Sequence, residues 1–205
     1  MTDSRRNKLA DILVNYCVSV QPGEWVVISG STVALPLIND LVERVLLAGG
    51  NPTAILNSGD LEETKFLFAN EKQLEWVSPL SKQVTEKADA LISVWATENL
   101  KNMNGIDPER MRIHQAAMQE INSLSSKRMA EGTLKWVGTQ FPCSAYAQEA
   151  DMSLRDFENF VYKATLVERE NPIKEWQEIK QRQQGLVKWM KGKMIWKHLL
   201  KIRNH

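Results

Sequence analysis

The sequence predicts an α/β protein with three layers, in which helices cover a mostly parallel sheet of about four or more strands. Short apolar runs near residues 25, 53, 90 and 134 alternate with longer segments of helical periodicity. The run within KADALISVWA is almost wholly apolar, as is typical of parallel strands that are buried on both faces. At about 100–200 residues per domain, a chain of 205 residues is one domain or slightly more.

The first part of the chain is predicted to alternate helix and strand. A helix over residues 5–19 places on one face Leu9, Ile12, Leu13, Tyr16 and Cys17. A Pro-Gly turn leads into a strand at 25–28. Ser31 is suited to cap the next helix, which we expect to end near Ala48, and a second strand follows at 53–56.

The middle of the chain is predicted to be mainly helical. Two amphipathic segments, at 61–70 and 72–77, precede a break at Pro79. A third strand is expected at 90–94, and it separates these segments from the remaining helices.

One long helix, one strand and two shorter helices are predicted for the rest. The long helix runs over 108–129 with proline in its first turn, and a strand follows at 133–138. A helix over 153–168 has Ser153 as its candidate cap, with an acid three residues later. The last helix starts at Pro172.

Charge and aromatic content favour no nucleic-acid partner. The 26 Lys and Arg residues and 25 Asp and Glu residues leave a net charge of only +1. Seven tryptophans could stack on bases, but Trp25, Trp95 and Trp136 belong to or border apolar strands. Core packing therefore explains these three better than base stacking does.

A cytoplasmic location is predicted. Cys17 and Cys143 cannot form a disulfide framework and lack the spacing of a zinc site, so a reducing compartment fits best. The first twenty residues do not form a signal peptide, and no run of eighteen apolar residues predicts a transmembrane segment.

The carboxyl-terminal end has an unusual composition. Residues 186–205 carry six basic side chains and no acid, together with many apolar residues. We therefore divide the chain into an α/β domain at 1–193 and a basic amphipathic tail at 194–205. As a helix the tail is of a type that binds anionic surfaces or acidic partners. A basic tail is more often only a solvated end, and a third interpretation is that it is not native sequence of the fold.

No residue is assigned a catalytic role from the pattern alone. His114 lies alone in the long helix, without HExxH or another histidine at metal-ligand spacing, so a structural role is favoured. Cys143 has no histidine close in sequence to act as its base, and Cys17 is expected in the core. Carboxylates cluster at Glu149, Asp151, Glu168 and Glu170, which we interpret as solvated surface.

Residues 30–32, Gly-Ser-Thr, lie between a strand and a helix, where α/β folds bind anions. The other glycines and the lysine of known phosphate-binding loops are absent, so Ser31 is expected only to cap the helix. The residues by themselves predict a soluble α/β domain with no complete active site.

Several segments together resemble one enzyme family. Residues 23–52, which end in GSTVALPLINDLVERVLLAGGNP, resemble the first strand–helix–strand unit of the metallo-aminopeptidases aminopeptidase T and aminopeptidase S. FPCSAYAQEADMSLRDFENFVYKA at 141–164 resembles a second family segment, with matches at Pro142, Ala145, Ala147, Gln148, Ala150, Met152, Ser153, Leu154, Glu158 and Phe160. IDPERM at 106–111 and the stretch at 171–193 follow in the expected order, so the resemblance covers about 8–193.

The resemblance implies the N-terminal domain of an enzyme about twice this length, which removes N-terminal residues from peptides. Family members use two divalent metals, zinc or cobalt, and such ions polarise the scissile carbonyl and generate hydroxide. Their glutamate, histidine and aspartate ligands and a helping tyrosine all belong to the C-terminal domain. None has a matching position here, so the resemblance implies no catalytic, cofactor-binding or metal-binding residue in this chain.

After Lys193 the chain departs from the family pattern into MIWKHLLKIRNH. If the codons for this run are read one nucleotide earlier, a suitable choice of synonymous codons encodes Asp/Asn-Asp-Leu-Glu-Thr. That sequence is acidic and typical of the start of a strand. We therefore predict a reading-frame slip near Lys193 and a truncated domain, inactive alone. Its exposed apolar surface should promote self-association into a homo-oligomer such as a dimer.

Two other functions stay open. The chain could be a natural interaction module that binds anionic surfaces through its basic tail. It could also be a nucleotide-binding domain that uses residues 30–32.

Overall fold

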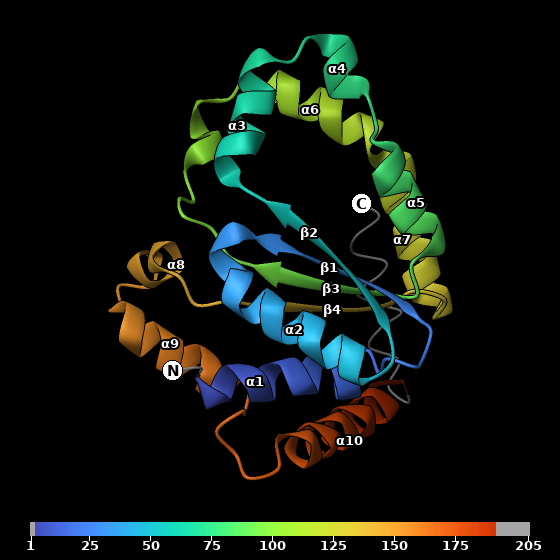
Figure 1. The fold of residues 1–205 in the computed structure, drawn as a ribbon, viewed down its shortest axis with the longest axis vertical. Helices are drawn as coiled ribbons and strands as arrows, with labels where there is room; N and C mark the ends of the chain where they lie inside the picture. The colour runs from blue at the N-terminus through green and yellow to red at the C-terminus, as the bar shows by residue number, and fades with distance from the viewer. Residues whose placement is uncertain (1–2, 192–205) are drawn as a thin grey trace. The chain divides into compact units, whose positions relative to one another are not determined.

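The computed structural model describes residues 3–191 (Figure 1). The chain divides into two compact units, Met1–Thr165 and Leu166–His205. The first unit contains the sheet, and the second contains helix α10 (Pro172–Lys191), the last helix expected from the sequence. The predicted basic tail at 194–205 lies outside the described residues.

The sheet confirms the predicted fold class. Its four strands are β1 (Trp25–Ser31), β2 (Asn51–Asn57), β3 (Ala90–Trp95) and β4 (Lys135–Gln140). All three pairings are parallel, and the strand order is β2-β1-β3-β4. Each strand lies within a few residues of its predicted position, because each is an apolar run that only a covered sheet can bury.

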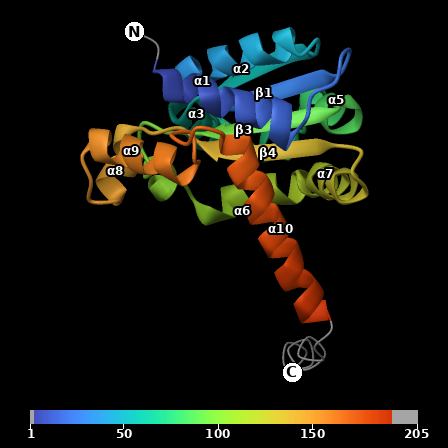
Figure 2. The ribbon, with the colours of Figure 1, turned by 90° about the horizontal axis from the view of Figure 1, so that it is seen from below.

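One face of the sheet is covered over its two central strands, β1 and β3, whereas Leu56 on the edge strand β2 is 44% exposed. Helices α1 (Ser4–Asp11), η1 (Ile12–Cys17) and α2 (Leu35–Leu47) lie on this side (Figure 2). The strand side chains that point towards them are almost completely buried: Val26, Ile28, Ala90, Ile92 and Val94. This layer forms the main core of the first unit.

The prediction that Cys17 belongs to the core is wrong. The helix begins as an α-helix but continues from Ile12 as a π-helix, in which Val18 N–H bonds to the Leu13 carbonyl at 3.1 Å. The wider turn breaks the period of 3.6 residues on which the prediction rested. Val14 is therefore buried in the core, while Cys17 is exposed.

The other face of the sheet is covered by helices α5 (Pro79–Lys87) and α7 (Gln119–Glu131). Buried residues at the centre of this contact are Val27, Ala88 and Leu134, with Trp25, Ile55, Val84, Leu91 and Met129 packed around them. Trp25, Val27 and Leu91 lie in the amino-terminal half of their strands, whereas Ile55 lies in the second half of β2.

Two helix boundaries differ from the prediction. Pro79 does not break the chain but starts α5, because proline fits the first turn of a helix, and the Ser78 hydroxyl accepts a hydrogen bond from Leu80 N–H at 3.2 Å. The expected helix over 108–129 is divided at Met118 into α6 (Pro108–Ala117) and α7.

A second, smaller core joins α3 (Gly59–Phe68), α4 (Glu71–Glu75), η3 (Asn102–Gly105) and α6. Its buried residues are Phe66, Leu74 and Ile106. Figure 1 shows these helices gathered beyond the end of β2. Helices α3 and α4 correspond to the two segments predicted as amphipathic and α6 to the first half of the predicted long helix, whereas η3 was not predicted.

The first unit ends with α8 (Ser144–Glu149) and α9 (Leu154–Ala164). As predicted, Ser153 caps α9, and its hydroxyl accepts a hydrogen bond from Asp156 N–H at 3.1 Å. The helix ends four residues earlier than expected, because Leu166 adopts a left-handed backbone with φ of 63°. Helix α8 was not predicted.

The predicted core role of the tryptophans is correct only for Trp25. That residue is half-buried, and its indole N–H donates to the Thr53 hydroxyl at 2.8 Å. Trp95 and Trp136 are each 56% exposed. Apolar neighbours in sequence did not bury them, because no helix in the described part of the first unit, residues 3–165, covers this part of the sheet.

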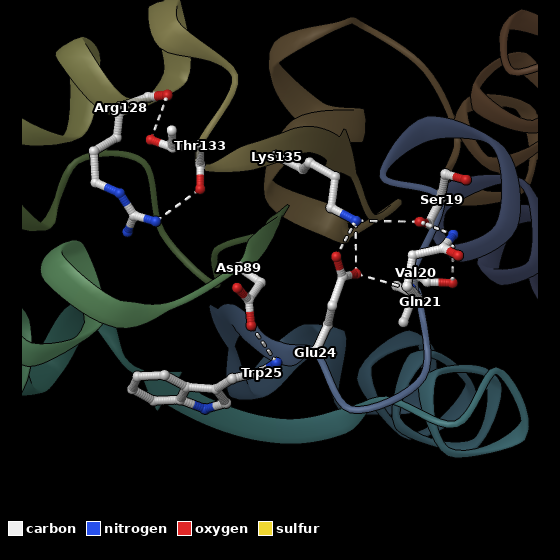
Figure 3. A network of polar contacts seen from close by, with 9 residues as sticks. All are labelled: Ser19, Val20, Gln21, Glu24, Trp25, Asp89, Arg128, Thr133 and Lys135. Atoms are coloured by element: carbon white, nitrogen blue, oxygen red, sulfur yellow. Dashed lines mark hydrogen bonds and ion pairs between the residues drawn. The ribbon is translucent and has the colours of Figure 1, made fainter.

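Polar contacts close the amino-terminal edge of the sheet (Figure 3). The Asp89 carboxylate accepts a hydrogen bond from Trp25 N–H at 2.8 Å, and Asp89 N–H donates to the Trp25 carbonyl at 3.0 Å. The Arg128 guanidinium donates to the carbonyls of Thr85 and Thr133, and so ties α7 to α5 and to the turn before β4. Over the described part of the chain, no helix has the length and apolar character needed to cross a bilayer.

Candidate functional site

The strand order places a candidate site at the carboxyl-terminal edge of the sheet. Strand β2 pairs with one side of β1, and β3 pairs with its other side. The connections that follow β1 and β3 therefore run in opposite directions along the sheet, and the direction changes between these two strands. In open α/β sheets, ligands bind in the crevice at this point. A cavity of about 570 Å³ lies here, lined by Ser31, Leu56, Asn57, Ser58, Gly59, Leu61, Glu62, Lys65, Ala96 and Thr97.

Only part of the Gly-Ser-Thr segment faces this cavity. The backbone at Gly30 packs so closely that a Cβ there would lie 2.8 Å from the Val94 carbonyl oxygen and 3.1 Å from Ile38 Cδ1. Gly30 is therefore required by the contact between β1, β3 and α2. This packing explains the glycine without any bound phosphate.

Ser31 serves as a cap, as the sequence predicted. Its hydroxyl accepts a hydrogen bond from Val33 N–H at 3.3 Å, at the start of the short helix η2 (Thr32–Ala34). Helix α2 itself begins only at Leu35, where Ala34 provides no side-chain cap. The segment thus forms a capped turn before the helix, rather than a glycine-rich loop that opens directly onto a helix N-terminus.

Lys65 connects the cavity to His114. The Lys65 ammonium lies 3.1 Å from His114 Nε2, and His114 Nδ1 lies 2.9 Å from the Leu74 carbonyl oxygen. Because a carbonyl only accepts and an ammonium only donates, Nδ1 carries the ring proton and Nε2 accepts. The ring also packs edge-on against Phe66, with centroids 5.6 Å apart. His114 therefore joins α3, α4 and α6, in agreement with the structural role favoured by the sequence.

Cys143 is buried directly before α8, with 4% of its surface exposed. No hydrogen bond joins its thiol to another residue in the described range 3–191. A nucleophilic cysteine needs a base within hydrogen-bond reach. The geometry around Cys143 therefore supplies none of the partners that such chemistry requires.

The carboxylate clusters occupy exposed positions. Glu149 pairs with Lys101 at 3.4 Å, and both side chains are more than half exposed. Asp151 is exposed next to it, in a left-handed conformation with φ of 53°. Glu168 and Glu170, also exposed, belong to the second unit.

Within residues 3–191, no three or more His, Cys, Asp and Glu side chains converge as metal ligands would. The cavity itself offers one carboxylate, Glu62, one ammonium, Lys65, and several hydroxyl and amide groups. Such a lining can bind a small polar molecule, but it contains neither a nucleophile paired with a base nor a set of metal ligands.

Sequence reasoning missed most of this lining. Asn57 at the end of β2, Ser58 and Gly59 at the start of α3 form a polar junction, and this run of small and polar residues is a signal visible in the sequence. Lys65 and His114 are 49 residues apart, so nothing local in the sequence indicates their contact.

Comparison with known proteins identifies the family. The family model described as thermophilic metalloprotease (M29) matches residues 2–203. The chain belongs to the M29 family. This match confirms the family resemblance of the sequence, and it also takes in most of the 194–205 segment.

Two curated relatives carry aminopeptidase names. "Aminopeptidase 2" of Geobacillus stearothermophilus is 24% identical over 199 residues, which cover 91% of this chain and 48% of the relative. "Aminopeptidase AmpS" of Bacillus subtilis (strain 168) is 23% identical over 181 residues, covering 83% of this chain and 44% of the relative. This M29 chain therefore spans about half the length of the curated relatives that it matches.

A solved structure has a similar fold. Wild-type AmpT from Thermus thermophilus aligns with a TM-score of 0.67 at 18% identity, over 85% of this chain and 45% of that chain. The family description implies a metal, yet residues 3–191 do not fit a metal-ligand set. No catalytic step is therefore assigned to a metal held by the described residues.

Proposed function

We propose that this chain is the amino-terminal half of an M29 metal-dependent aminopeptidase, and that the other half of the intact enzyme supplies the metal ligands. The observation that carries the proposal is the coverage: 91% of the chain aligns with only 48% of an aminopeptidase. In the intact enzyme the substrate would be a peptide, and two divalent ions, zinc or cobalt, would polarise its scissile carbonyl.

The finer parts of the proposal concern this chain itself. Residues 1–193 act as the α/β half, and a reading-frame slip near Lys193 produced the segment 194–205. The chain is cytoplasmic, in keeping with its two free cysteines, Cys17 and Cys143. It is inactive alone and self-associates, as a dimer or larger homo-oligomer.

Nucleotide sequence tests the frame slip most directly. The locus should be read past codon 193 in all three frames. A second frame that continues into a domain with Glu, His, Tyr and Asp residues is expected. An intact relative from the same source with MIWKHLLKIRNH in frame would exclude the slip.

Metal content and hydrolysis test the assignment of the ligands. The purified chain is mixed with Zn²⁺ or Co²⁺, dialysed and assayed for bound metal and for cleavage of leucyl-p-nitroanilide. We expect no stoichiometric metal and no cleavage. Tight binding of two ions per chain would contradict the proposal, because it would place the ligands within these residues.

A non-catalytic interaction module is the alternative, and the six basic side chains without any acid over 186–205 favour it. Such a module should bind anionic vesicles in a salt-dependent way. Deletion of 194–205 should then abolish the binding. If every reading frame closes soon after codon 193, this alternative becomes the better account.

A further inference from the structure

Within the described part of the first unit, residues 3–165, helices cover the second face of the sheet mainly at its amino-terminal half. Val27 and Leu91 are register partners within the core beneath α5 and α7, and Val27 is 1% exposed. Further along the strands, Trp95 is 56% exposed. On the opposite face, Val94, the neighbour of Trp95 in β3, is 2% exposed. Parallel sheets are normally covered on both faces, so the described part of the first unit lacks a layer over this part of the sheet.

Small residues form the floor of the uncovered part. Ser29, Ser93 and Gly138 are register partners on three adjacent strands, and the two serine hydroxyls lie 3.2 Å apart. Because these hydroxyls bond to each other, apolar groups can cover them at a lower cost in lost hydrogen bonds to water.

Two indoles flank this floor. Trp95 lies so close over Gly138 that a Cβ at position 138 would be 2.6 Å from its Cη2 atom. Trp136, on the edge strand β4, is the register partner of Leu91 and is also 56% exposed. We name Ser29, Ser93, Trp95, Trp136 and Gly138 together the Trp95/Trp136 face. Large exposed aromatic side chains such as these two tryptophans are typical of protein interfaces.

We propose that the Trp95/Trp136 face is the surface onto which the remaining half of an intact M29 enzyme packs, through the apolar side of a helix. This inference rests on the proposed function. The described part of the first unit leaves this half-face open, and the relatives carry a further half of similar length that this chain does not match. A helix is the expected occupant because helices are the elements that cover parallel strands.

The test pairs this full chain with the part of Geobacillus stearothermophilus aminopeptidase 2 that lies outside its match, made as a separate polypeptide. Hydroxyl-radical footprinting measures the oxidation of each tryptophan in the chain alone and in the mixture. We expect Trp95 and Trp136 to be oxidised in the chain alone and protected at least about threefold in the mixture. Trp76, which is 61% exposed and lies outside this face, should not change.

Matched variants provide a second readout. Trp136→Arg should weaken binding of the added half by about tenfold or more, whereas Trp76→Arg should change it less than about twofold. Circular dichroism establishes whether each variant is folded. If Trp136→Arg does not fold, the hydroxyl-radical footprinting of the unmodified chain still tests the proposal. The proposal would be overturned if Trp136→Arg and Trp76→Arg weakened binding of the added half equally. It would also be overturned if Trp76 were protected as strongly as Trp95 and Trp136.

Other occupants give distinct results. Protection of both tryptophans in the chain alone that rises with its concentration would show that a second copy occupies the face. Protection in the chain alone at every concentration would show that the chain covers it by itself. Either result overturns the proposed occupant.

Leucyl-p-nitroanilide hydrolysis in the same mixture separates this inference from the proposed function. Protection without hydrolysis supports the docking face and counts against the aminopeptidase function. Hydrolysis without protection of Trp95 and Trp136 supports the function and overturns the docking face.

Discussion

Lys135 and Glu24 form an ion pair that connects two strands separated by a third. The Lys135 ammonium on β4 lies 2.6 Å from Glu24 Oε2 and 2.7 Å from Oε1, in the turn before β1 (Figure 3). It also donates to the Ser19 carbonyl at 3.2 Å, and Glu24 Oε2 accepts from Gln21 N–H at 2.8 Å. Because β3 lies between β1 and β4, this contact fixes the edge strand across the sheet.

Replacing Lys135 should therefore destabilise the domain. We expect Lys135→Met to lower the free energy of unfolding by about 1–2 kcal/mol, because it leaves a carboxylate and a carbonyl without their charged donor. Both side chains are no more than about a third exposed, so solvent screens the pair only in part. Urea denaturation measures the effect.

Lys127→Met is the matched control. Lys127 pairs with Glu131 one helical turn away at 3.9 Å, and both side chains are more than half exposed. Its loss should cost less than about 0.5 kcal/mol. Equal costs for the two variants would mean that the Lys135 contact adds nothing to the sheet.

Tyr162 should make the stability depend on alkaline pH. Burial raises the pKa of its phenol to about 12, with the nearby charges of Asp3 and Glu158 acting in the same direction. In the unfolded chain the phenol loses its proton near pH 10, whereas in the folded chain it stays neutral. Its contribution is therefore complete below pH 10 and is lost as the pH rises from 10 to 12, at about 1.4 kcal/mol per pH unit.

Tyr162→Phe isolates this effect, because the variant keeps the ring and removes the titrating group. The stability difference between the unmodified chain and the variant should be constant below pH 9.5 and then shift in favour of the variant. Denaturation at several pH values between 9 and 11.5 measures it. Parallel curves over this whole range would contradict the raised pKa of Tyr162.

Gly30 should tolerate no side chain. In Gly30→Ala the new methyl group would meet the Val94 carbonyl, which is part of the β3 backbone and cannot turn away. We expect a loss of about 1–3 kcal/mol, seen as a lower Tm in thermal denaturation.

Gly105→Ala is the control for this substitution, because no atom lies within 4 Å of a Cβ at that position. Its Tm should stay within about 2 °C of the unmodified chain. If Gly30→Ala also left the Tm unchanged, the close approach of β1 and β3 at this point would be disproved.

Arg6 and Asp40 form the most buried ion pair of the described residues, between α1 and α2. Asp40 is 8% exposed, and the Arg6 side chain is 19% exposed. Arg6→Met would leave a buried carboxylate without its partner and should cost about 2–4 kcal/mol. In the double variant Arg6→Met/Asp40→Leu, much of this loss should be recovered, because the unpaired charge is gone. A double-mutant cycle by urea denaturation measures the coupling, and purely additive losses would refute it.

Local patterns in the sequence were sufficient to predict the layers of this fold. Each strand is an apolar run of suitable length. Ser153 caps its helix by a hydrogen bond to Asp156, which is only three positions away in the sequence. The family resemblance of 141–164 was likewise visible in the sequence alone. The sequence by itself predicted no complete active site, and that expectation stays a prediction.

Tertiary structure decided what depends on partners distant in sequence. Only the fold brings Lys65 to His114 and Lys135 to Glu24, because those pairs are 49 and 111 residues apart. The exposure of Trp95 was equally beyond sequence reasoning. An apolar strand predicts that a residue lies on a sheet, but whether a helix covers that residue depends on where the rest of the chain packs.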